Sequence, residues 1–111
     1  MAIRIVSNIC IADEDIPAYL EWWRERSKVC RAERGNLQYE VFRSIEHPNQ
    51  FALLEAWEDQ ETYDEHWEAQ QQLDRPTFAR APRTTGRDGL EFYHDLQYYR
   101  LVDGQWVPAE D

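Results

Sequence analysis

Two kinds of hydrophobic period alternate along this chain of 111 residues, and their order constrains the fold more than any other feature. Four segments alternate apolar and polar residues, as strands do, and two segments repeat apolar residues every three or four positions, as amphipathic helices do. The predicted strands are residues 3–11, 37–45, 50–58 and 90–102. The predicted helices are residues 16–34 and 60–73. The order of elements is therefore βαββαβ.

Capping and turn-forming residues mark the ends of these segments. Asp13 or Asp15 can cap the first helix and Pro17 suits its first turn. Gly35 or Asn36, either of which can adopt the left-handed conformation, is expected to end that helix. Asp59 can cap the second helix, and the EHPN sequence at residues 46–49 predicts the turn of a β-hairpin.

This order predicts an α+β fold of the ferredoxin-like type, in which an antiparallel sheet carries both helices on one face. The length suits one domain with one core, so residues 1–111 are predicted to be a single domain. The first strand carries Ile3, Ile5, Ile9 and Ile11 on one face and Val6, Asn8 and Cys10 on the other. Because both faces are apolar, we expect one to meet the helices and the other to meet a second subunit in a homodimer.

The hydrophobic periodicity of the chain ends after residue 73. Residues 74–89 contain two Pro, two Gly and four Arg, and they predict a loop or lid that is basic within an acidic protein. Its arginines are Arg75, Arg80, Arg83 and Arg87. Residues 90–108 predict a C-terminal strand and a short returning strand, with a hairpin turn at Asp103-Gly104.

The charge and the termini exclude several classes of partner. A net charge of −10 repels nucleic acid and anionic lipid, so neither is an expected partner. The N-terminus does not resemble a signal peptide, and no apolar run approaches the ~20 residues of a membrane helix. We therefore expect a cytoplasmic protein in which Cys10 and Cys30 are buried thiols rather than a disulfide.

Candidate chemistry rests on polar residues within apolar patterns, because the sequence has no motif for a metal, flavin, haem or nicotinamide cofactor. Asn8 interrupts the first strand, Glu55 lies among large apolar residues of the third, and His66 lies on the apolar face of the second helix. Together they suggest a polar pocket between sheet and helices. The alternative is structural: Asn8 and His66 could pair with each other, and Glu55 with Arg43 on the neighbouring strand.

The central part of the chain resembles the antibiotic biosynthesis monooxygenase family. The resemblance is carried by RGNLQYEVFRSIEHPNQFALLEAWEDQETYDEH, residues 34–66: a Gly before the second strand, an EHPN turn, an F-x-L-x-E-x-W strand and a His on the second helix. It implies a dimeric α/β barrel, formed by two ferredoxin-like subunits whose sheets face each other, with a pocket in each subunit. Family activities include oxygenation of quinols and polyketide phenols without metal or flavin.

Two branches of that family fit less well. The polyketide branch has a strand Trp and a following Tyr, which Trp57 and Tyr63 match, but Leu53 stands where that branch has Asn. In the haem-degrading branch the second helix carries a Trp, where this chain has His66, and a later His, where it has Pro76. The resemblance therefore favours the quinol type and argues against haem breakdown.

We accordingly predict a cofactor-independent monooxygenase that oxidises a hydroquinone or polycyclic phenol with O₂. His66 would be the base, Asn8 would hydrogen-bond the developing oxyanion or peroxide, and Glu55 would orient His66 or bind a substrate hydroxyl. The expected substrate-binding residues are Trp57, Tyr63, Tyr39, Trp23 and Leu53. Two alternatives stay open: an isomerase or lyase that uses the same His without O₂, and a dimer that binds a small molecule without catalysis.

Overall fold

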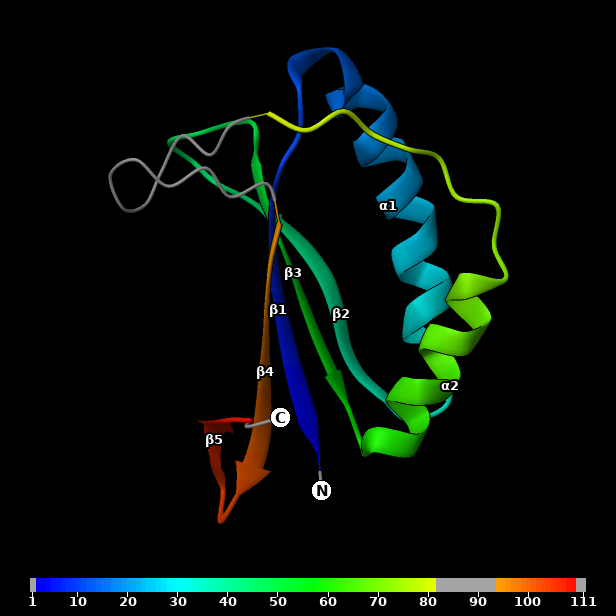
Figure 1. The fold of residues 1–111 in the computed structure, drawn as a ribbon, viewed down its shortest axis with the longest axis vertical. Helices are drawn as coiled ribbons and strands as arrows, with labels where there is room; N and C mark the ends of the chain where they lie inside the picture. The colour runs from blue at the N-terminus through cyan, green and yellow to red at the C-terminus, as the bar shows by residue number, and fades with distance from the viewer. Residues whose placement is uncertain (1, 82–93, 110–111) are drawn as a thin grey trace.

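The computed structural model describes residues 2–81 and 94–109, and it confirms the predicted α+β order, including the short returning strand at the C-terminal end (Figure 1). The strands are β1 (Ile3–Cys10), β2 (Asn36–Arg43), β3 (Gln50–Trp57), β4 (His94–Val102) and β5 (Gln105–Pro108). The helices are α1 (Ile16–Arg31), which follows a 3-10 turn at Asp13–Asp15, and α2 (Gln60–Gln71). The start of the strand predicted at residue 90 lies outside the described residues.

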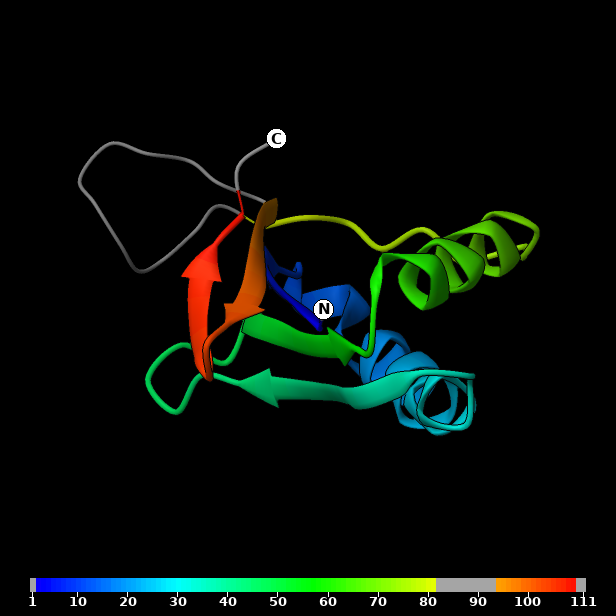
Figure 2. The same cartoon turned by 90° about the horizontal axis from the view of Figure 1, so that it is seen from below.

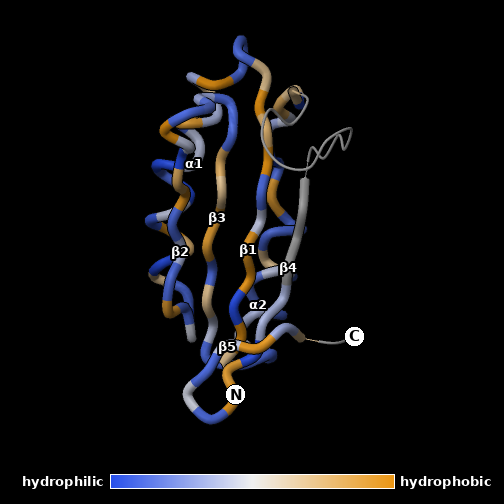
Figure 3. Tube along the Cα trace, turned by 90° about the vertical axis from the view of Figure 1, so that its left-hand side faces the viewer, coloured by the Kyte–Doolittle hydropathy of each residue, from blue (hydrophilic) through white to orange (hydrophobic). Residues whose placement is uncertain are grey.

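The sheet is antiparallel, with strand order β2-β3-β1-β4-β5, and both helices lie on the same side of it (Figure 2). Figure 3 shows β2, β3, β1 and β4 side by side, with hydrophobic residues along the two central strands. Glu55 of β3 is paired in register with Ile5 of β1 and with Tyr39 of β2. Directly paired residues point to the same face of an antiparallel sheet, so these three side chains share the face that the helices cover.

The core fills the space between this face and the helices. One cluster of buried residues comprises Ile3, Ile5, Cys30, Tyr39, Trp57 and Tyr63. A second comprises Ile11, Ile16, Tyr19 and Phe51. Cys10 and Cys30 are buried free thiols, as predicted. In the described ranges, no helix has the length and hydropathy that crossing a bilayer requires.

The predicted caps of the two helices behave differently. Asp59 caps α2, because its carboxylate accepts a hydrogen bond of 2.9 Å from the backbone N–H of Thr62. Asp15 makes no capping bond to α1. Its carboxylate instead accepts a bond of 2.6 Å from the backbone N–H of Ala79, because residues 72–81 pass directly over the start of α1.

Residues 72–81, which we call the crossing segment, lead from α2 past α1 to the end of β1 (Figure 1). Backbone bonds attach its end to β1 and the residues after it: Ala12 N–H donates to Ala79 O at 2.9 Å, and Ala81 N–H donates to Cys10 O at 3.0 Å. Half of the predicted Arg-rich loop is thus fixed to the sheet. Its other half, with Arg83 and Arg87, lies outside the described residues.

Gly35 fixes the turn between α1 and β2 against α2. Its φ is +78°, a left-handed conformation, and a Cβ at this position would overlap the Cγ2, Cβ and Oγ1 atoms of Thr62. Its carbonyl also accepts a bond of 2.8 Å from Glu58 N–H. The close approach of this turn to α2 holds Glu33 beside that helix.

Replacing Gly35 with Ala is therefore expected to destabilise the protein by about 2–4 kcal/mol, because the new methyl group adds overlap with Thr62 to backbone strain. Gly104→Ala is the matched control: Gly104 has a φ of +79° but open space around it, so only the strain of about 1 kcal/mol applies. Urea unfolding of both variants measures the difference. An equal loss of unfolding free energy in the two variants would show that the contact with Thr62 does not restrict the residue at position 35.

Candidate functional site

A cavity of about 170 Å³ lies between the sheet, the two helices and the crossing segment. Its aromatic walls are Tyr19, Trp23, Tyr39, Tyr63 and Trp67. Its polar lining groups are Ser7, Glu55, His66, Gln70, Arg75 and Arg80. An apolar pocket with a few convergent polar groups is the usual form of a small-molecule site.

Most of the residues predicted from the sequence meet at this cavity. Glu55 and His66 both line it, and so do the predicted wall residues Tyr63, Tyr39, Trp23 and Leu53. Trp57 lies behind the cavity: its side chain is fully buried, and its ring centroid is 4.6 Å from that of His66. Trp57 therefore supports the histidine rather than forming the lining.

The structure does not bring Asn8 to this cavity. The residues of β1 that line it are Ser7 and Ile9, and the alternation of a strand turns Asn8 to the opposite face, with Val6 and Cys10. Asn8 therefore cannot pair with His66 or touch a molecule bound beside it. The polar group that β1 offers to the cavity is the buried hydroxyl of Ser7, which the sequence analysis did not select.

His66 lies between two carboxylates. Its Nδ1 is 3.0 Å from Glu33 Oε1, and its Nε2 is 3.8 Å from Glu55 Oε1. Because a carboxylate only accepts hydrogen bonds, Nδ1 carries the hydrogen and Nε2 keeps its lone pair. The side chain is only 2% exposed, and burial lowers the pKa of His66 although Glu33 opposes this effect, so the imidazole is neutral near pH 7.

Glu33 is the main group that the sequence analysis missed. It lies in the turn after α1, where no hydrophobic period or motif singles it out, and only the packing of that turn against α2 places it at His66. Arg26 Nη2 lies 4.0 Å from the same Glu33 oxygen and balances part of its charge. A carboxylate behind an imidazole is the arrangement that orients a histidine base.

Glu55 is a buried carboxyl with one hydrogen bond. Trp57 Nε1 donates to its Oε1 at 3.1 Å. Burial raises the pKa of Glu55 to about 7, the bond from Trp57 opposes this rise, and the nearby Glu33 adds to it. The alternative pairing with Arg43 does not occur, since Arg43 Nε donates to the Pro48 carbonyl at 2.6 Å. Glu55 can therefore exchange a proton near neutral pH.

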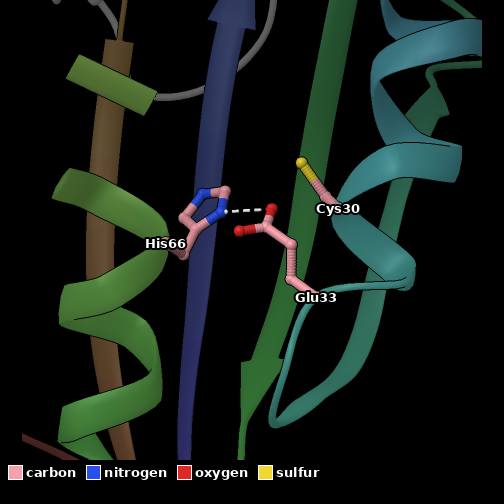
Figure 4. A group of neighbouring side chains, drawn as sticks. All are labelled: Cys30, Glu33 and His66. Atoms are coloured by element: carbon pink, nitrogen blue, oxygen red, sulfur yellow. Dashed lines mark hydrogen bonds and ion pairs between the residues drawn. The ribbon is translucent and has the colours of Figure 1, made fainter. Parts of the chain in front are cut away.

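Cys30, Glu33 and His66 are the described residues with the closest resemblance to a metal-binding set (Figure 4). Their donor atoms all lie within 4.8 Å of one another. Burial raises the pKa of the Cys30 thiol to about 12, whereas a metal binds the thiolate. Glu33 and His66 also satisfy each other by hydrogen bonding. These features favour a proton-holding pair next to a buried thiol.

Comparison with known proteins places this site in a family context. Residues 2–74 match the family model described as antibiotic biosynthesis monooxygenase. No curated protein matches the chain. A solved structure named as an antibiotic biosynthesis monooxygenase shares 28% identity at a TM-score of 0.55, over 58% of this chain and 67% of its own.

Two further solved structures support the fold alone. A conserved protein from Methanosarcina mazei Go1 has 19% identity and a TM-score of 0.64, covering 90% of this chain and 92% of its own. Protein PA3566 of Pseudomonas aeruginosa has 20% identity and a TM-score of 0.64, covering 91% and 95%. Their coverage extends the similarity in fold beyond the part of the chain that the family model matches.

The raised pKa of Glu55 predicts a specific pH dependence of stability. The folded protein holds this proton up to about pH 7, whereas the unfolded chain releases it near pH 4.5. The resulting stabilisation is complete below pH 4.5 and is lost as the pH rises through 7. Glu55→Gln never ionises and keeps an acceptor for Trp57. It should therefore gain up to about 3 kcal/mol relative to wild type between pH 4.5 and 8.

Urea unfolding at several pH values measures this gain. Glu68→Gln is the control, because Glu68 is an exposed glutamate on α2 and its loss removes the same charge. A difference between Glu55→Gln and wild type that stays constant with pH would contradict the assignment.

Proposed function

The chain belongs to the antibiotic biosynthesis monooxygenase family, and on that premise we propose that it is a cofactor-independent monooxygenase that oxidises a hydroquinone or related phenol with O₂. The observation that carries this proposal is the buried, neutral His66, whose Nδ1 is held by Glu33 and whose ring lines an aromatic cavity. Such an imidazole presents an unprotonated nitrogen to a phenol that stacks among aromatic walls.

The reaction begins when His66 Nε2 takes the phenolic proton. The resulting anion is electron-rich at a ring carbon, and that carbon forms a bond to O₂ and becomes a hydroperoxide once it is protonated. Loss of water from the hydroperoxide leaves a carbonyl. For a hydroquinone the balance is C₆H₆O₂ + O₂ → C₆H₄O₃ + H₂O, so the substrate supplies all the electrons and one oxygen atom enters the product.

The neighbouring polar groups support these proton transfers. Glu33 stabilises the imidazolium that forms when His66 gains a proton. Glu55, with a pKa of about 7, supplies or accepts the proton that the departing water requires. Ser7, rather than Asn8, offers a hydroxyl to the oxygen atoms of the intermediate.

We also assign a dimer to this protein. On the sheet face opposite the helices, Val6, Ala52 and Leu54 form an apolar strip across the two central strands, and Phe42 beside it is 47% exposed. A second copy of the same face would cover this surface.

Light scattering after size exclusion should therefore give about twice the monomer mass of 13.4 kDa at micromolar concentration. Leu54→Lys should weaken the dimer, because it places a charge within the strip. Ile45→Lys, at a fully exposed turn position, should leave the mass unchanged. A wild-type mass near 13.4 kDa would exclude the dimer.

The role of His66 predicts that His66→Ala reduces quinol-dependent O₂ uptake by about 10²–10⁴-fold, the usual contribution of a positioned base. His47→Ala is the matched control, because His47 lies in the turn between β2 and β3 and does not line the cavity. O₂ uptake and melting temperature are measured on the same samples. A destabilised His66→Ala that keeps wild-type uptake would reduce the residue to a structural role.

The variant Glu33→Gln tests whether His66 acts as a base or is only a buried structural residue. An amide removes the negative charge that stabilises protonated His66, so the pKa of His66 should fall further. The pH at which O₂ uptake rises to half its maximum should then move to a lower value, and the maximal rate should drop by about ten-fold or more. An unchanged pH profile would contradict the pairing. Turnover of a quinol with no O₂ uptake would indicate an isomerase or lyase instead.

A further inference from the structure

Two arginines lie where the inner cavity meets an outer hollow. The outer hollow, of about 520 Å³, is lined mainly by the crossing segment and α1. Arg75 and Arg80 line both spaces, as do Ile9, Tyr19 and Trp23, so these residues form the boundary between them. The backbone bonds of Ala79 and Ala81 hold the segment around Arg80 in place.

The other described arginines of the helices and turns each have a partner within the protein, which is Glu33 for Arg26 and the Tyr39 carbonyl for Arg31. Arg24 pairs with Glu21, and Arg34 pairs with Glu61 and Glu65. Among the described side chains, those of residues 2–81 and 98–109, neither Arg75 nor Arg80 has a carboxylate within 4.0 Å. Both line a cavity boundary in a chain of net charge −10, where Asp74 is the one carboxylate among the described lining residues of the outer hollow. Together the two guanidinium groups favour an anion at this boundary.

The inner cavity also has a polar group without a partner. Gln70 is 6% exposed and lines the cavity, and its Oε1 is buried with no hydrogen-bond partner among the described residues. A buried acceptor of this kind is costly unless a ligand supplies a donor such as a hydroxyl. The volume of about 170 Å³ accommodates roughly one aromatic ring, since a cavity of about 150 Å³ binds benzene.

We propose that this site selects hydroxylated aromatic acids: one ring occupies the inner cavity, its hydroxyl groups reach His66 and Gln70, and its carboxylate lies at the boundary between Arg75 and Arg80. The inference rests on the proposed function, because it takes this cavity as the substrate site. It adds the acidic substituent, which the chemistry at His66 does not itself require. Guanidinium groups bind carboxylates with paired, charge-assisted hydrogen bonds.

The test compares two probes that differ only in the acid group, 2,5-dihydroxybenzoate and hydroquinone. Binding is measured without O₂, by quenching of tryptophan fluorescence and by calorimetry. Wild type should bind the acid about ten-fold more tightly or better, the effect of one charge-assisted hydrogen bond. The preference should disappear in the double variant Arg75→Gln/Arg80→Gln. It should persist in Arg24→Gln, which removes an equivalent exposed charge away from the cavity.

Each outcome decides the inference separately from the function. A preference that survives the double variant, equal binding of both probes, or no binding of the acid overturns it. Binding of the acid that depends on the two arginines, without O₂ uptake, supports the inference and contradicts the monooxygenase proposal. Oxidation of hydroquinone, together with no tighter binding of the acid than of hydroquinone, supports the monooxygenase proposal and contradicts the inference.

Discussion

The candidate site depends on the interaction of one buried imidazole, that of His66, with the carboxyl groups of two glutamates. Glu33 at 3.0 Å and Glu55 at 3.8 Å approach opposite nitrogens of His66, and they come from the α1–β2 turn and from β3. Burying either carboxylate alone would be unfavourable. The hydrogen bond from His66 and the nearby Arg26 stabilise Glu33, while Glu55 keeps a proton up to about pH 7. The two acids therefore have different environments around the same base, which suits separate proton-transfer roles.

The fold creates these different environments because buried core residues pack on one side of His66 and Glu55, and polar residues line the cavity on the other side. Trp57 is fully buried, donates to Glu55 and contacts the His66 ring, so the core fixes both groups from behind. On the other side, the crossing segment brings exposed arginines to the edge of the cavity. Rigid packing behind His66 and Glu55 holds the two side chains in fixed positions, as preorganised sites require.

The order of the secondary-structure elements and two residues of the candidate site could be predicted from local sequence patterns. Hydrophobic period gave the order of the elements because a strand or helix with one buried face must repeat its apolar residues with period 2 or 3.6. The same reasoning selected Glu55 and His66, each a polar residue on an apolar face. It failed for Asn8 because alternation had already assigned that residue to the face of Val6 and Cys10, and treating it as a pocket residue ignored that assignment.

By itself, the sequence determined the secondary structure, the ferredoxin-like order and the two polar positions on the inner faces, since each depends on residues within a few positions of one another. The tertiary structure alone decided that Glu33 holds His66, that Ser7 replaces Asn8 at the cavity, and that Arg75 and Arg80 reach its edge. Glu33 and His66 are 33 positions apart and meet because the turn at Gly35 packs on Thr62. Contacts between irregular segments leave no period in the sequence, so only the packed chain reveals them.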